Sequence, residues 1–352
     1  MTKPIIMRIA YIMLLISLSS LILISFLRPT SQHVGINDYY RARFLDMVEG
    51  KAYKPFVYRT LLPTIVRGVS LIVPEQFQIM CTDLVSQPGL LRRAFYFFSW
   101  GKKAAFQYLL ASFLMLLCFM GFGHITVLLT ERLCNIPKTG KSRLLLASGA
   151  LLGLPPFFSY TSFPYDPPQL FLFTLALYYL ATQRAKLFYI TFVACCLNKE
   201  TAILLIPLYA LNFGTTISSR RRNLAKIIAL LMVYVGIKVF LAWIFQANPG
   251  TFVEFQLQHN IGLLTRGWTF TTLVVVSIIV IMIFFDWGKK SYFLKTSFLL
   301  VLIPLVTLAF FLGFLDEWRG YYEAYPLAFG LSVHSLNSLK NIPKYIENSN
   351  YI

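Results

Sequence analysis

The residues of this sequence that could do chemistry are a few charged side chains in a mostly apolar chain. A carboxylate can accept a proton from an attacking group, and an arginine or lysine can bind and neutralise a phosphate. Charges inside a membrane-spanning stretch need a reason, because each costs at least about 2.5 to 3.5 kcal/mol at the bilayer centre. In chain order, the candidates are Asp38 (NDYYRAR), Arg59 (YRTLLP), Asp166 (PYDPP), Lys199 and Glu200 (NKET), and Glu317, Arg319 and Glu323 (DEWRGYYE).

Each candidate also has a structural explanation that gives it no chemical role. An exposed loop position would account for Asp38, the anchoring of an interfacial helix for Arg59, and a helix N-cap for Asp166. An internal ion pair would account for the two charges of NKET, and a salt-bridge cluster for those of DEWRGYYE. Both interpretations stay open at this point.

The chain that positions these residues has the composition of a membrane protein. Of its 352 residues, 57% are apolar and only 13% are charged, and a helix needs about 20 apolar residues to cross the hydrocarbon layer. The first such run, residues 5–27, ends without a small-residue cleavage site and so predicts a retained anchor. The five cysteines show no disulfide or zinc spacing. We therefore expect an all-α, polytopic transmembrane bundle that forms one integral membrane domain over residues 1–352.

The positions of the basic loops predict about ten membrane segments, with both termini in the cytoplasm. Residues 28–103 form a long first extracytoplasmic loop, and residues 104–340 form the transmembrane bundle. The outer loop is expected to carry interfacial helices, because AFYFFSW is flanked by basic residues that suit lipid headgroups. The expected segments are 5–27, 104–130, 144–163, 169–182, 188–211 as two short arms, 224–246, 268–285, 293–314 and a last short helix.

The apolar run 188–211 is expected to fold back on itself at Asn198, Lys199 and Glu200. If the run crossed the bilayer once, the basic triplet at 220–222 would lie outside, against the positive-inside tendency. Each arm has only about 11 residues, so the arms must be tilted, extended or shielded by neighbouring helices. With this threading, the candidate residues all lie at the outer ends of spans, where they could form one polar site.

The net charge of +18 does not indicate a nucleic-acid partner. The predicted cytoplasmic loops hold most of the excess lysine and arginine, as they do in many membrane proteins. The sequence has no Gly-rich phosphate loop, HExxH motif or nucleophile motif. Its four histidines show no metal-ligand spacing.

The motifs and the predicted architecture resemble the GT-C superfamily of integral membrane glycosyltransferases. The likeness rests on NDYYRARFLD beyond the first span, YRTLLP in the outer loop, the YDPP turn, the NKETAILLIPL hairpin and a late Glu-Trp-Arg segment. It implies transfer of a sugar from a polyprenyl-phosphate-linked donor to a glycan, lipid or protein acceptor at the outer face of the membrane. Many members carry two neighbouring acids in the first loop, whereas this chain has Asn37 and Asp38. This departure leaves a divalent metal open, and no other cofactor is expected.

The resemblance and the residue chemistry together suggest a role for each candidate. The first-loop acid is implied to be the catalytic base, and cationic side chains would stabilise the departing lipid phosphate. The remaining acids, with tyrosines that suit sugar faces, would position the substrate. The assignments are Asp38 as catalytic; Arg59, Lys199 and Arg319 as donor phosphate-binding; and Tyr40, Tyr165, Asp166, Glu200, Glu317 and Glu323 as substrate-positioning.

Two other functions fit the same charges. A transporter or flippase for a lipid-linked saccharide or another anion would use them as a pathway, but it is expected to show broken helices in matching positions of two halves. The sequence has one interrupted segment and no counterpart to it. A non-catalytic membrane subunit would tolerate neutralisation of the charges. In all three cases we expect a multi-pass protein of the bacterial inner (plasma) membrane, in contact with membrane lipid.

Overall fold

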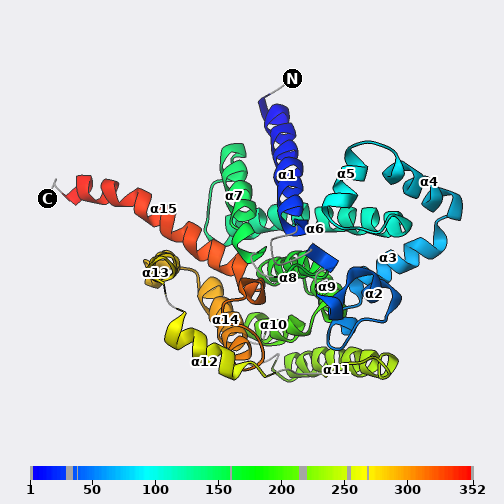
Figure 1. Ribbon diagram of the computed structural model, residues 1–352. Helices are drawn as coiled ribbons and strands as arrows, with labels where there is room; N and C mark the ends of the chain where they lie inside the picture. Colours follow the sequence, from blue (N-terminus) through cyan, green and yellow to red (C-terminus); the bar gives the residue numbers. More distant parts are fainter. Residues whose placement is uncertain are drawn as a thin grey trace.

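The computed structural model describes residues 3–28, 35–37, 39–158, 161–213, 220–251, 255–267 and 269–349. Every regular element in these ranges is a helix, in agreement with the all-α prediction. Figure 1 shows their arrangement. The α-helices are α1 (Lys3–Leu27), α2 (Phe44–Glu49), α3 (Leu61–Ile72), α4 (Glu75–Ser86), α5 (Leu90–Phe97), α6 (Ala105–Leu133), α7 (Gly140–Leu152), α8 (Asp166–Ala181), α9 (Ala185–Asn198), α10 (Leu205–Phe213), α11 (Arg220–Ile244), α12 (Leu257–Arg266), α13 (Phe270–Phe284), α14 (Tyr292–Leu312) and α15 (Tyr325–Ser349).

Within the described residues, four helical stretches are long and apolar enough to cross a membrane: 5–27, 102–133, 223–244 and 292–312. A fifth is obtained if the bent pair α12 and α13 is taken as one broken span. Much of the apolar surface of these helices is exposed, as at Val239 and Trp243 of α11, which are 63% and 65% exposed. Such surface suits contact with lipid. These helices are candidate spans by their length and hydropathy. In Figure 1, two of them, α1 and α11, run in different directions.

The core is built around α8, which lies between α6 and α9 near the middle of the molecule (Figure 1). This helix is apolar on most sides, a pattern that favours burial all round. Its Phe173 is fully buried, as are Phe122 of α6 and Phe188 and Phe192 of α9. On the other side of α6, α1 and α7 pack against each other and against α6. Because α8 is enclosed in this way, its first residue, Asp166, also lies in the interior.

Two segments differ from the predicted boundaries. The expected span 144–163 corresponds to α7, which ends at Leu152, followed by a short 3-10 helix at Pro155–Phe158. The prolines at 155 and 156 cannot continue an α-helix. A hydropathy profile does not detect this helix end, because the residues that follow are still apolar. The last helix, expected to be short, has 25 residues in α15. Its second half is polar, so an apolar pattern reveals only its first half.

The helices of the first loop, α2 to α5, lie on one side of the molecule (Figure 1), where their buried residues pack into the same apolar core as α6. In α5, Phe95 is buried, whereas Tyr96 is 89% exposed and the basic residues Arg92 and Arg93 are also exposed. In α3, Leu71 and Ile72 are more than three-quarters exposed. These short helices therefore present apolar and basic side chains outward, and their position at a membrane interface remains a prediction.

The predicted fold-back of residues 188–211 is confirmed. Helix α9 ends at Asn198, Lys199 is extended with φ −154° and ψ 154°, and a 3-10 helix, η6 (Glu200–Leu204), leads into α10. The two arms meet again near their far ends, where the hydroxyls of Tyr189 and Tyr209 lie 2.7 Å apart. The rings of Phe188 and Tyr209 also stack there, with centroids 5.4 Å apart. The chain therefore reverses at Lys199, which places the NKET charges at the tip of a helical hairpin.

Candidate functional site

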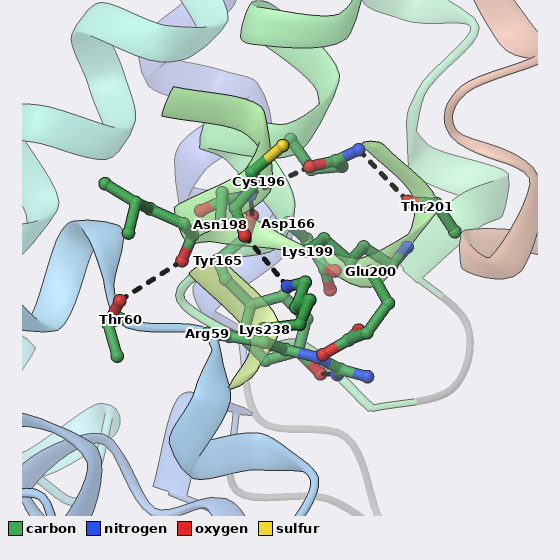
Figure 2. Close-up of polar contacts among 12 residues, drawn as sticks. Arg59, Thr60, Tyr165, Asp166, Cys196, Asn198, Lys199, Glu200, Thr201 and Lys238 are labelled. Atoms are coloured by element: carbon green, nitrogen blue, oxygen red, sulfur yellow. Dashed lines mark hydrogen bonds and ion pairs between the residues drawn. The ribbon is translucent and has the colours of Figure 1, made fainter. Parts of the chain in front are cut away.

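The structure brings most of the predicted site residues into one group. They come from the segment before α3, the start of α8, the tip of the α9–α10 hairpin and the segment between α14 and α15. Figure 2 shows part of this group around the hairpin tip. We call it the polar cluster and define it as Arg59, Tyr165, Asp166, Lys199, Glu200, Glu317, Arg319 and Glu323.

The hairpin tip is stabilised by groups from other parts of the chain. The last carbonyls of a helix have no partner within the helix and need donors from elsewhere. At the end of α9, the Cys196 carbonyl accepts a hydrogen bond from Lys238 Nζ of α11 at 2.8 Å. The Leu197 carbonyl accepts one from the backbone N–H of Thr60 at 2.9 Å. The Thr60 hydroxyl donates to the same carbonyl at 3.3 Å (Figure 2). Both bonds tie the residue after Arg59 to the hairpin and so bring Arg59 to the cluster.

Arg59 joins the first loop to the hairpin tip and to α8. Its Nε lies 3.3 Å from Glu200 Oε2, and its Nη1 donates to the Tyr165 hydroxyl. Its guanidinium also lies over the Tyr165 ring, 4.3 Å from the centroid. The positive charge of Arg59 favours the ionised form of Glu200, and the pair holds the guanidinium at the hairpin tip.

Asp166 and Arg319 connect the start of α8 with the segment after α14. Asp166 is the first residue of α8 and not its N-cap, which is Tyr165. Its Oδ2 accepts a hydrogen bond from the Phe163 N–H at 3.2 Å and lies 3.8 Å from Arg319 Nη1. Burial raises the pKa of Asp166 despite the nearby cations. Arg319 is held more closely by Glu317, with Nε 2.5 Å from Oε1.

Glu323 is fully buried and is held by three neighbours. Its Oε1 lies 3.3 Å from Lys199 Nζ, accepts a hydrogen bond from Gln169 Nε2 at 3.1 Å, and accepts another from the Thr201 hydroxyl. Gln169 in turn accepts a bond from Asn198 at 3.0 Å. This network joins α8, the hairpin tip and the segment before α15.

Four buried oxygens of this region have no hydrogen-bond partner: Asp166 Oδ1, Asn198 Oδ1, Glu200 Oε1 and Glu323 Oε2. A buried acceptor without a partner costs about 1 to 3 kcal/mol, so such groups are uncommon in folded proteins. All four are acceptors, and they belong to residues of one hydrogen-bonded network. A ligand or water that supplied hydrogen-bond donors here would recover this cost.

The two arginines of the cluster flank a pair of stacked rings. Phe163 and Tyr165 are nearly parallel, at 8°, with centroids 5.2 Å apart. The Arg319 guanidinium lies 4.2 Å from the Phe163 centroid, and that of Arg59 lies over Tyr165. Each guanidinium has five N–H donors, and the contacts described above engage only part of them. The aromatic rings thus fix the planes of the two guanidinium groups, each of which has N–H donors beyond those used in these contacts.

Of the two remaining predicted site residues, one is not described and the other lies apart from the cluster. Asp38 lies outside the described residues. Tyr40 is 53% exposed, and its hydroxyl accepts a hydrogen bond from Arg41 Nε at 3.0 Å rather than contacting the charged side chains of the cluster. Ring contacts connect it toward the cluster, since Tyr39 contacts Tyr40 on one side and Phe163 on the other.

Sequence reasoning missed the polar residues that hold the cluster together, namely Gln169, Asn198 and Thr201. Lys238, whose Nζ caps the end of α9, was not among the predicted site residues either. Gln169 and Lys238 share a signal that could have identified them, because each is an isolated polar residue in an otherwise apolar helical run. Such residues inside a membrane segment usually have a specific partner.

Among the residues that the structure describes, no group of three or more His, Cys, Asp or Glu side chains is arranged to hold a metal ion. Comparisons with protein-family models, curated proteins and solved structures give no match to this chain. The fold and the candidate spans are compatible with an integral membrane protein.

Proposed function

We propose that this protein is a GT-C-like glycosyltransferase that moves a sugar from a polyprenyl-phosphate-linked donor to an acceptor at the outer face of the membrane. One observation supports this most directly: the polar cluster combines two arginines, each with free donor capacity, and four unpartnered acceptor oxygens. Phosphate oxygens accept hydrogen bonds, and sugar hydroxyls can donate them. A sugar linked to a phosphate meets both requirements in one molecule.

The proposed reaction is a substitution at the anomeric carbon of the donor sugar. An acceptor hydroxyl attacks this carbon, and Asp38 takes the hydroxyl proton. The bond between the anomeric carbon and the phosphate oxygen breaks, and the polyprenyl phosphate leaves with the electron pair. Arg59, Lys199 and Arg319 stabilise the charge that develops on the departing phosphate.

The remaining acids position the substrate and the cations. Glu200 orients Arg59, and Glu317 orients Arg319, each through the ion pair described above. Asp166 and Glu323 offer their unpartnered oxygens to sugar hydroxyls. Tyr165 acts through Arg59, because its ring lies under the guanidinium and its hydroxyl accepts a hydrogen bond from Nη1. Tyr40 would contact the acceptor from the exposed side.

The membrane arrangement is part of this proposal. About ten membrane segments, with both termini in the cytoplasm of a bacterium, put the polar cluster at the outer face of the inner membrane. The shorter apolar helices α9 and η6–α10 supply candidates for segments beyond the four long ones. Helices α3 to α5 would lie in the headgroup layer. The prenyl chain of the donor could then stay in the bilayer while its head group enters the cluster.

The test is a transfer assay with the full-length protein in lipid nanodiscs and a panel of polyprenyl-phosphate sugars, radiolabelled in the sugar. We expect the wild type to release labelled sugar from at least one donor, to an acceptor extract or to water. Asp38→Asn should lower this release by about 100-fold or more, the usual contribution of a positioned general base. An Asp38→Asn protein that folds and keeps full activity would show that the base is assigned wrongly.

A transporter for a lipid-linked saccharide is the second candidate, and the break at Lys199 favours it. Transporters often place such breaks at their binding sites. The same nanodisc experiment separates the two functions when it is repeated in sealed vesicles. A transporter moves the intact labelled donor between leaflets, whereas a transferase cleaves it.

A further inference from the structure

The short helix α12 contacts the end of α14 and the segment that follows it through two neighbouring residues. His259 lies against the Phe314 ring, with centroids 4.8 Å apart, and its Nε2 is 3.8 Å from Asp316 Oδ1. Asn260 makes the buried contacts.

Asn260 is fully buried and is the one buried residue of this helix, whose other side chains are exposed or half-buried. Its amide Nδ2 lies 3.0, 2.8 and 2.8 Å from the carbonyl oxygens of Ala309, Phe310 and Gly313. Its Oδ1 accepts a hydrogen bond from the Leu315 N–H at 3.0 Å.

These bonds fix the end of α14 and the first residues after it. The last carbonyls of α14 need donors from outside the helix, and Asn260 supplies them to Ala309 and Phe310. The backbone N–H of Gln256 supplies another to Phe311 at 2.9 Å. Through Leu315, the same asparagine also sets the direction in which the chain leaves the helix. One side chain thus joins α12, the end of α14 and the segment that follows.

The segment that follows carries Arg319. Beyond Leu315, Tyr321 donates from its hydroxyl back to the Leu315 carbonyl at 3.3 Å, and the Glu317 carbonyl accepts from the Gly320 N–H at 2.9 Å. These bonds make a compact turn with Arg319 inside it. The position of this turn relative to α8 decides whether Arg319 lies over Phe163 and close to Asp166.

We propose that Asn260 is a positioning residue for Arg319, acting through the turn at 313–321 and not by contact with the substrate. The inference rests on the proposed role of Arg319 in binding phosphate. It adds that α12, which lies outside the polar cluster, controls the phosphate affinity of the cluster. A cap that served only to stabilise α14 would have no such selective effect on Arg319.

The test is a double-mutant cycle of phosphate affinity with Asn260→Ala and Arg319→Gln in the full-length protein in nanodiscs. The probe is undecaprenyl phosphate, whose Kd is measured for the wild type, both single variants and the double variant. We expect Asn260→Ala to weaken binding by about tenfold, equivalent to about 1.4 kcal/mol. The double variant should bind no more weakly than Arg319→Gln, because Asn260 acts only through that residue.

The matched control is Asn212→Ala. Asn212 also donates from its amide to a backbone carbonyl, that of Leu208 at 2.8 Å, but within α10 and far along the chain from the turn. Its replacement should leave the Kd unchanged. If Asn260→Ala yields too little folded protein, Asn260→Ser keeps one donor and one acceptor and is measured in its place.

Three results would overturn the inference. The first is an Asn260→Ala protein with the wild-type Kd, and the second is a double variant in which the effects of the two substitutions on the Kd add. The third is a turn at 313–321 that keeps its wild-type position in Asn260→Ala. The turn is followed directly by acrylamide quenching of Trp318, with the other four tryptophans replaced by phenylalanine. We expect Asn260→Ala to increase this quenching. If Arg319→Gln alone leaves the Kd unchanged, the proposed phosphate site is wrong, and the Trp318 measurement then decides the positioning role by itself.

Discussion

Replacing Arg319 by glutamine is expected to lower sugar transfer by about 100- to 1000-fold, the loss seen when one group that stabilises developing charge is removed. Arg319 lies over Phe163 and is held by Glu317, so its plane is fixed before any ligand arrives. Glutamine keeps two N–H donors but loses the charge and the rigid fork of five. The measurement is kcat/KM with the best donor of the panel.

The matched control for this variant is Arg266→Gln. Arg266 is an exposed arginine at the end of α12, in the same region of the chain but outside the polar cluster. Its substitution tests whether the loss of any one positive charge affects donor binding through long-range attraction. We expect less than a twofold change at physiological salt, because exposed charges are screened over about 8 Å. Equal losses in both variants would mean that Arg319 acts only by its charge.

Removing either partner of the Lys199–Glu323 pair is expected to destabilise the fold by about 3 to 5 kcal/mol, because the other charge stays buried and uncompensated. Glu323 is fully buried and Lys199 is 8% exposed. Glu323→Ala also leaves Gln169 and Thr201 without their shared acceptor. The measurement is the midpoint of thermal unfolding in one detergent, followed by size-exclusion chromatography.

The double variant Lys199→Met with Glu323→Gln separates structure from function at this pair. Replacing a buried ion pair by groups of similar size is often close to neutral for stability. We therefore expect the midpoint temperature of the double variant to return most of the way to the wild-type value. Its rate of sugar transfer should stay low, because the cation near the phosphate is absent. A double variant with full stability and full activity would assign Lys199 a structural role alone.

The general architecture could be predicted from hydropathy and charge because both report on burial and topology. The fold-back at Lys199 followed from the basic triplet at 220–222, and the structure confirms it through Tyr189 and Tyr209. The gathering of Arg59, Asp166 and Arg319 also followed from topology. Residues at the same end of several packed spans lie close together, so their polar side chains are expected to contact one another.

The internal order of the polar cluster could not be predicted. It depends on which carbonyls are left without partners at the end of α9 and on which side chains reach them, as those of Lys238 and Thr60 do. The role of Asn260 could not be predicted either, because a single asparagine in a polar stretch of sequence gives no indication that it is buried. Helix ends were also missed where prolines stop an apolar run, as at 155 and 156, because hydropathy does not include backbone constraints.

A polar cluster that acts as proposed binds the phosphate of a polyprenyl-phosphate lipid. Such binding is detected by photo-crosslinking with undecaprenyl phosphate that carries a diazirine on its first isoprene unit, followed by peptide mapping. We expect labelling within 56–60, 163–169, 198–201 and 315–323, and less of it in Arg59→Gln and Arg319→Gln. Labelling confined to other segments, such as helices α1 and α7, would contradict this binding site.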